Sequence, residues 1–268
     1  MIKIGLAVVF ASFLGFFFEL VIFGFLNQNS GTEAAGSYFA GYTIIFAYFG
    51  LILNSIVVDY FPRISSKIDD LGYVINELNE QSKIGLIIIL PLSLILAFFS
   101  DFIVSLLFSI EFVEASNFID YAIMGSIFIV LSNNLGMIII AKKLSKPYTL
   151  ITLIHRLLLL ILYIVLFNSF GFTGLGIGYC LNGLLQFLFY EFFLFKYHDI
   201  RHDKYNYLLL LFTIISTVFV LILKNNILFN ENYSNIAFAL FFTMCSFISL
   251  KKIQDNRGFQ FLEKLYKK

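Results

Sequence analysis

The stretch TLIHRLLLLILYIV at 152–165 places a histidine and an arginine side by side in an otherwise apolar run. A charge at bilayer depth costs about 2.5–3.5 kcal/mol even on insertion scales, so such side chains normally face protein or a water-filled cavity. A guanidinium in that position can offset the charge of a phosphate or of an acidic sugar. Arg156 is therefore a candidate for substrate contact, with His155 beside it.

The apolar run at 174–196 carries polar side chains on one helical face. Asn182 and Gln186 share that face, whereas Glu191 points elsewhere. Counted from the turn at 170–171, Gln186 lies at the same depth as Arg156. Asn182 and Gln186 are thus predicted to form hydrogen bonds with a substrate. The alternative is an ion pair between Arg156 and Glu191 that only holds two helices together.

Three further polar residues lie inside apolar runs. Asn133 and Asn134, in SNNLG at 132–136, either line a polar path or form hydrogen bonds between helices. Glu19 shares a helical stripe with small residues such as Gly15, which permit close helix approach. Glu19 is a candidate coupling site for a proton or another cation, as is Glu191. Glu19 is equally explained as a neutral, hydrogen-bonded carboxylic acid.

These residues must be positioned by helices that cross a membrane. Of 268 residues, 60% are hydrophobic and 13% are charged, with a mean hydropathy of +0.90, whereas a soluble domain carries about 25% charged residues. The apolar residues fall into runs long enough for a helix to cross about 30 Å of hydrocarbon. We expect an all-α polytopic membrane protein with about eight transmembrane helices, at 4–26, 37–57, 84–108, 117–140, 148–168, 174–196, 207–223 and 234–250.

Basic residues gather in alternate links between these runs. Of the 18 lysines and arginines, all except Arg156 and Lys224 lie in segments on the same side as the N-terminus. The positive-inside rule places both termini in the cytoplasm. The longest cytoplasmic link repeats apolar residues at steps of four and three, which predicts an amphipathic helix near 64–82 on the membrane face. This helix either moves with the spans or only shields the connection.

Few features of the sequence favour an enzyme. The outward links are about ten residues or shorter and their acidic residues are isolated, so they offer no scaffold for the paired carboxylates of glycosyl chemistry. The sequence contains no H-E-x-x-H, P-loop or G-x-S-x-G motif, and no basic tract suited to nucleic acid. Cys180 and Cys245 lie inside predicted spans, where packing is the default role. We expect no catalytic residue, metal or cofactor.

Four segments carry a family resemblance: TEAAGSYFAGYTI at 32–44, VVDYFPRIS at 57–65, ILPLSLILAFFSDFIVSLLFSIEF at 89–112 and GFTGLGIGY at 171–179. In order and spacing they resemble the carboxyl half of the polysaccharide and lipid-linked oligosaccharide flippases. These are the O-antigen exporter type of the multidrug/oligosaccharidyl-lipid/polysaccharide superfamily. The last two apolar runs match that family in hydropathy and length.

The resemblance implies a six-helix carboxyl lobe over residues 1–200, two additional transmembrane helices over 201–250 and a cytoplasmic tail over 251–268. Family members resemble two lobes around a central cavity, and such transporters work by rocking one lobe against the other. The resemblance therefore implies a partner, which is either a missing amino-terminal lobe or a second copy of this chain.

The implied function is translocation of a polyprenyl-pyrophosphate-linked sugar repeat unit across the bacterial inner membrane for surface polysaccharide biosynthesis, by a partial or truncated transporter. In this interpretation Arg156 and His155 meet the charged part of the substrate. The amides of Asn182, Gln186, Asn133 and Asn134 would bind sugar hydroxyls.

Two other functions stay open from the sequence. One is a cation-coupled exporter of drugs or small solutes in the same superfamily, with Glu19 as the coupling site. The other is a structural membrane subunit or a non-transporting remnant, in which Arg156 merely pairs with Glu191.

Overall fold

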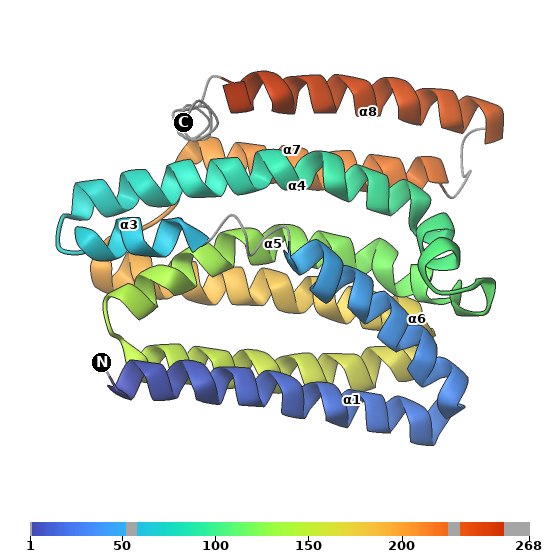
Figure 1. Cartoon of the computed structure of the whole chain (residues 1–268), viewed down its shortest axis with the longest axis horizontal. Coiled ribbons are helices and arrows are strands. Elements are labelled where there is room, and N and C mark those ends of the chain that lie inside the picture. Colours follow the sequence, from blue (N-terminus) through green and yellow to red (C-terminus); the bar gives the residue numbers. More distant parts are fainter. Residues whose placement is uncertain (1, 52–57, 225–230, 255–268) are drawn as a thin grey trace, which may run out of the picture.

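The computed structural model describes residues 2–51, 58–224 and 231–254 (Figure 1). Over these residues the chain is helical and contains no strand. In chain order the elements are α1 (Ile2–Tyr42), η1 (Thr43–Phe49), α3 (Tyr60–Ser66), α4 (Leu71–Leu107), η2 (Ile110–Phe112), α5 (Ala115–Ala141), α6 (Ser145–His198), α7 (Lys204–Lys224) and α8 (Glu231–Gln254).

Helices α1 and α6 each consist of two helical arms that form a hairpin. The backbone of α1 leaves helical geometry at Gly31 (φ 85°, ψ 175°) and that of α6 at Gly171 (φ 60°, ψ −138°), and Figure 1 shows the chain turning back at each of these turns. Only glycine adopts such positive φ angles without a penalty. Among the described residues, five helices are long and apolar enough to cross a membrane. Because α1 and α6 each supply two arms, these helices and α8 account for the predicted runs, apart from 52–57 of the second run, which lies outside the described residues.

Glycines let the arms and helices of the bundle approach closely. A Cβ at Gly174 would collide with the backbone carbonyl of Leu166 on the other arm of α6. A Cβ at Gly125 of α5 would lie 2.7 Å from the carbonyl oxygen of Tyr179, and one at Gly183 would lie 2.6 Å from that of Gly125. Small residues at such crossings are typical of packed transmembrane helices. The result is a tight seam between α5 and the second arm of α6.

The amphipathic helix predicted near 64–82 is divided in the structure. Helix α3 ends at Ser66, and the side chain of Asp70 accepts a hydrogen bond from the backbone N–H of Tyr73, which starts α4. Asp70 is the N-cap of α4, and its side chain satisfies a backbone amide that has no partner within the new helix. A new helix therefore starts here, and the segment is divided. From there α4 continues into the next span, and its Val74 and Leu78 are fully buried in the bundle core. Ile64 and Leu78 of the apolar stripe therefore pack against protein, whereas Leu71 is exposed.

Arg63, from the segment VVDYFPRIS, joins α3 to α4. Its Nη1 lies 2.7 Å from Oε2 of Glu77, and its Nη2 donates to Oε1 of Gln81 over 2.9 Å. The short helix is thus fixed to the start of the span that follows it.

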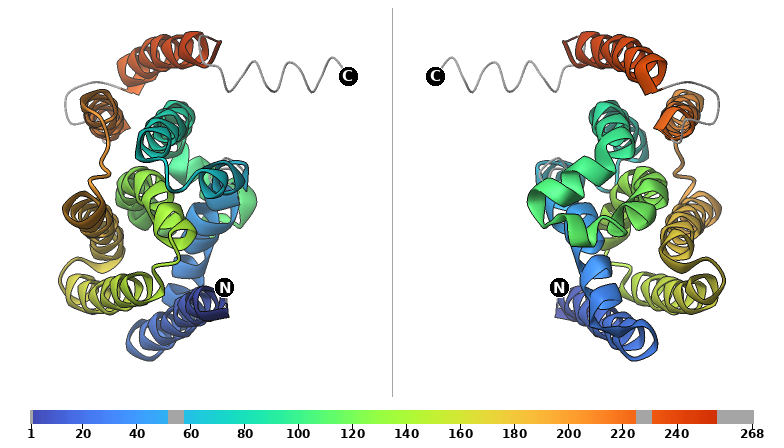
Figure 2. Two further views of the ribbon diagram at one scale, coloured as in Figure 1. Left: turned by 90° about the vertical axis from the view of Figure 1, so that its left-hand side faces the viewer. Right: turned by 90° about the vertical axis from the view of Figure 1, so that its right-hand side faces the viewer.

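The last two helices pack on one side of the bundle. Helix α7 lies along α4, and α8 contacts both through an apolar cluster that includes Leu94, Val220 and Phe238. Figure 2 places α8 at one edge of the molecule and the first arm of α1 at the opposite edge. Cys180 and the buried Cys245 are free thiols.

Candidate functional site

A cavity of about 330 Å³ lies between α1, η1, α5 and both arms of α6, a volume at the lower end for small-ligand sites. The residues predicted to bind substrate that line it are Asn133, His155, Arg156, Asn182 and Gln186. Further polar lining comes from Ser12, Ser126, Tyr148, Thr152, Tyr179 and Tyr190. The polar faces inferred for the runs at 148–168 and 174–196 thus meet in one space, and their role in binding stays a prediction.

Arg156 reaches across this cavity toward α1. A methyl group at Gly15 would lie 3.2 Å from its Nη2, so the absence of a side chain at Gly15 makes room for the guanidinium. Nε of Arg156 is buried and has no hydrogen-bond partner among the described residues. Since an unsatisfied buried donor costs about 1–3 kcal/mol, this donor favours a guest that brings an acceptor.

Glu19 lies in the same interior, close enough to Arg156 and Tyr38 for electrostatic interaction with both. Two residues of its predicted stripe contribute directly to the site: Ser12 lines the cavity and Gly15 contacts Arg156. The carboxylate therefore shares its surroundings with a permanent cation supplied by the protein itself. Whether Glu19 couples transport to an ion stays a prediction.

His155 and Asn182 join the two arms of α6. Nδ2 of Asn182 and Nε2 of His155 are 2.6 Å apart, and both side chains are buried. Oδ1 of Asn182 has no hydrogen-bond partner among the described residues. The pair therefore holds the hairpin together and still leaves one acceptor at the cavity wall.

Asn134 does not belong to the cavity wall that the described residues form. Its amide donates to Oγ of Ser82 over 3.1 Å, so the side chain points from α5 toward α4. Asn133 and Asn134 are adjacent on one helix and consequently face different sides. For Asn134 the structure thus contains the hydrogen bond between helices that was the alternative to lining a polar path, and any contact with substrate stays a prediction.

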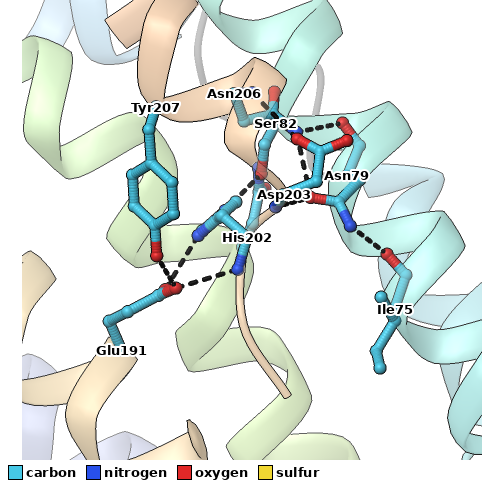
Figure 3. A network of polar contacts seen from close by, with 9 residues as sticks. Ile75, Asn79, Ser82, Glu191, His202, Asp203, Asn206 and Tyr207 are labelled. Atoms are coloured by element: carbon cyan, nitrogen blue, oxygen red, sulfur yellow. Dashed lines mark hydrogen bonds and ion pairs between the residues drawn. The ribbon is translucent and has the colours of Figure 1, made fainter. Parts of the chain in front are cut away.

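The Arg156–Glu191 ion pair is not formed. Oε2 of Glu191 lies 2.8 Å from Nδ1 of His202, and Oε1 accepts the backbone N–H of His202 over 2.8 Å and the hydroxyl of Tyr207 (Figure 3). The link after α6 folds back and brings these partners to the side of the helix that Glu191 faces. The interpretation of Arg156 as a purely structural residue depended on an ion pair with Glu191, and Glu191 instead contacts His202 and Tyr207.

Figure 3 shows that Glu191 belongs to a polar network at the start of α7. Nε2 of the buried His202 lies 2.8 Å from Oγ of Ser82 on α4. Asp203 caps α7 by accepting the N–H of Asn206, while its own N–H donates to Oδ1 of Asn79. We call Asn79, Ser82, Asn134, Glu191, His202, Asp203, Asn206 and Tyr207 the α7 network. A role for His202 was not predictable from the sequence, because nothing in RHDKYN indicates burial.

The far end of α7 is tied down as well. Nζ of Lys224 lies 2.7 Å from Oδ2 of Asp120 on α5 and 3.2 Å from Oδ2 of Asp101 on α4, and donates to Oγ of Ser100. Between the two ends, Oγ of Ser93 and Oγ1 of Thr217 are 3.0 Å apart. These contacts join α7 to the bundle along its whole length.

Over the part of the chain that the structure covers, His, Cys, Asp and Glu form no group of three suited to a metal ion.

Comparison with known proteins shows what the chain is similar to. No family model matches it, and no curated protein is significantly similar in sequence. Among solved structures it resembles the lipid II flippase MurJ in its inward closed conformation, with a TM-score of 0.61 and 16% sequence identity. The match covers 88% of this chain and 52% of that protein. The chain thus has a polytopic membrane fold of the MurJ type and spans about half the length of that flippase.

Proposed function

We propose that this chain is one lobe of a flippase that moves a polyprenyl-pyrophosphate-linked sugar repeat unit across the bacterial inner membrane, for surface polysaccharide biosynthesis. The observation that carries the proposal is the guanidinium of Arg156, which lies in a polar cavity with its Nε unsatisfied. A diphosphate supplies the charge and the acceptors that this group lacks. The likeness in fold to a protein named as a lipid II flippase supports the same substrate class.

The proposal includes the arrangement in the membrane. Residues 1–200 form the six-helix lobe, residues 201–250 supply the two additional helices, and both termini lie in the cytoplasm. The second half of the pathway comes from an amino-terminal lobe or from a second copy, because alternating access needs two bodies that move against each other. The chain covers 52% of the flippase it resembles, which supports a two-body transporter.

The test is Arg156→Ala in cells that depend on this gene for surface glycan. We expect lost surface glycan and accumulated lipid-linked oligosaccharide at an unchanged membrane level of the protein, and partial activity for Arg156→Lys, which keeps the charge but not the planar fork. Leu157→Ala, at the neighbouring exposed position, is the control. Normal glycan display by Arg156→Ala would contradict the assignment of Arg156 as the group that binds the diphosphate.

A cation-coupled drug or solute exporter is the second candidate, and the proximity of Glu19 to Arg156 and Tyr38 favours it. The two functions differ in what deletion of the gene does. Loss of a glycan flippase lowers surface glycan and raises its lipid-linked precursor, whereas loss of a drug exporter leaves both unchanged and raises drug sensitivity.

A further inference from the structure

The turn between α5 and α6 carries three lysines next to the cavity. Ile140 and Tyr148, which precede and follow this turn, both line the cavity, so the turn lies at its end. We call Lys142, Lys143 and Lys146 the lysine turn. Among the described residues none of the three forms an ion pair, and Lys143 and Lys146 are exposed.

The backbone of the turn is unusual for the residue it holds. Lys143 has φ 59°, and the N–H groups of Lys143 and Leu144 bond the carbonyls of Ile140 and Ile139, which is the left-handed ending of a helix. Glycine is the usual residue at such a position, and an L-residue there costs about 1–2 kcal/mol. A backbone outlier that is maintained in this way is a reason to look for a function.

Most acids at this end of the bundle are engaged elsewhere. Lys142 lies within electrostatic reach of His198 at the end of α6, and the exposed Asp199 follows that histidine. At the same end of the bundle, Glu191 and Asp203 are engaged in the α7 network. No acid among the described residues forms an ion pair with the lysine turn, which therefore presents unpaired positive charge at the end of the cavity.

We propose that the lysine turn is the first binding station for the diphosphate headgroup of a prenyl lipid before it passes to Arg156. Lys146 and Arg156 are ten residues apart on one helix arm, about 15 Å at 1.5 Å per residue, so one diphosphate cannot contact both at once. The two sites act in sequence. The inference rests on the proposed function and names the group that the chain recognises first.

The test measures binding of a labelled short-chain prenyl diphosphate to the purified full chain in phosphatidylcholine nanodiscs. The variant combines Lys142→Gln, Lys143→Gly and Lys146→Gln, in which Lys143→Gly also relieves the backbone penalty and protects folding. The control combines Lys67→Gln, Lys196→Gln and Lys204→Gln, and removes the same charge from the same end. We expect the affinity to fall about tenfold or more in the variant and less than about twofold in the control.

Equal losses in variant and control, or no loss in either, would overturn the proposal. So would equal competition by phosphatidylglycerol, which would make the turn an ordinary contact with anionic lipid, or by inorganic pyrophosphate, which would make the free anion the ligand. Arg156→Ala separates this inference from the proposed function. If prenyl diphosphate binds at the lysine turn while Arg156→Ala still exports glycan, only the assignment of Arg156 fails.

Discussion

At the scale of single residues, the cavity is built around groups whose bonding is incomplete. Nε of Arg156 and Oδ1 of Asn182 are buried without hydrogen-bond partners among the described residues, although both side chains line the cavity. Most buried polar atoms in proteins are paired. A donor and an acceptor left free at one wall are what a polar guest with hydroxyl and phosphate groups requires.

The position of the guanidinium depends on Gly15. A methyl group there would lie 3.2 Å from Nη2, so Gly15→Ala must displace Arg156. We expect glycan export to fall several-fold with little change in thermal stability, because the side chain can move within the cavity. Gly24→Ala is the matched control, since no atom lies within 4 Å of its added methyl. Equal export by the two variants would show that the site tolerates a shifted guanidinium.

At the scale of elements, α7 is bound by polar contacts and not only by its apolar face. His202 is fully buried and contacts Glu191 on α6 and Ser82 on α4. These contacts attach the link between α6 and α7 to both α6 and α4. They also explain why Glu191 is not available to Arg156.

His202→Ala is therefore expected to destabilise the protein strongly. It leaves the carboxylate of Glu191 partly buried with one partner fewer, and a buried polar group that loses its hydrogen-bond partner costs about 1–3 kcal/mol. The measurement is thermal unfolding of the purified protein in detergent. His198→Ala serves as the control, because His198 is less buried and lies outside the α7 network. A change below about 1 kcal/mol for His202→Ala, the range of an exposed pair, would show that the contact contributes little.

At the scale of the whole molecule, hydropathy and the lengths of the apolar runs were sufficient to predict an all-α bundle of long apolar helices. The runs at 4–26 and 37–57 fold back at Gly31, and those at 148–168 and 174–196 at Gly171. The polar faces of the α6 arms were predictable too, because helical phase places Asn182 and Gln186 on one face of their arm and the distance from the turn places Gln186 level with Arg156. The partners of Asn134 and Glu191 were not, since Ser82 and His202 come from distant segments and only tertiary packing chooses between them.

The proposed division into residues 1–200 and 201–250 leads to a prediction about the chain as a whole. A protein that ends at Ile200 loses Lys224 and His202, so Asp120 and Glu191 stay behind without these partners. We expect it to accumulate several-fold less and to aggregate in size-exclusion chromatography. A chain that ends at Gln254 keeps α7 and α8 and should behave like the full protein. Equal behaviour of the two shortened chains would make residues 1–200 a self-sufficient unit.

The glycine seam between α5 and α6 limits how this protein can evolve. Gly125 and Gly183 leave no room for even one added methyl group, so the backbones on that side of the cavity cannot be reshaped by single substitutions. Tyr148, Thr152 and Gln186 line the cavity from α6, and their side chains can be exchanged without the backbone collisions that a methyl group at either glycine would cause. A lineage that changes its cargo would therefore keep the frame and vary these side chains. Divergent sequences would then retain the same helix positions while their recognition surfaces drift apart.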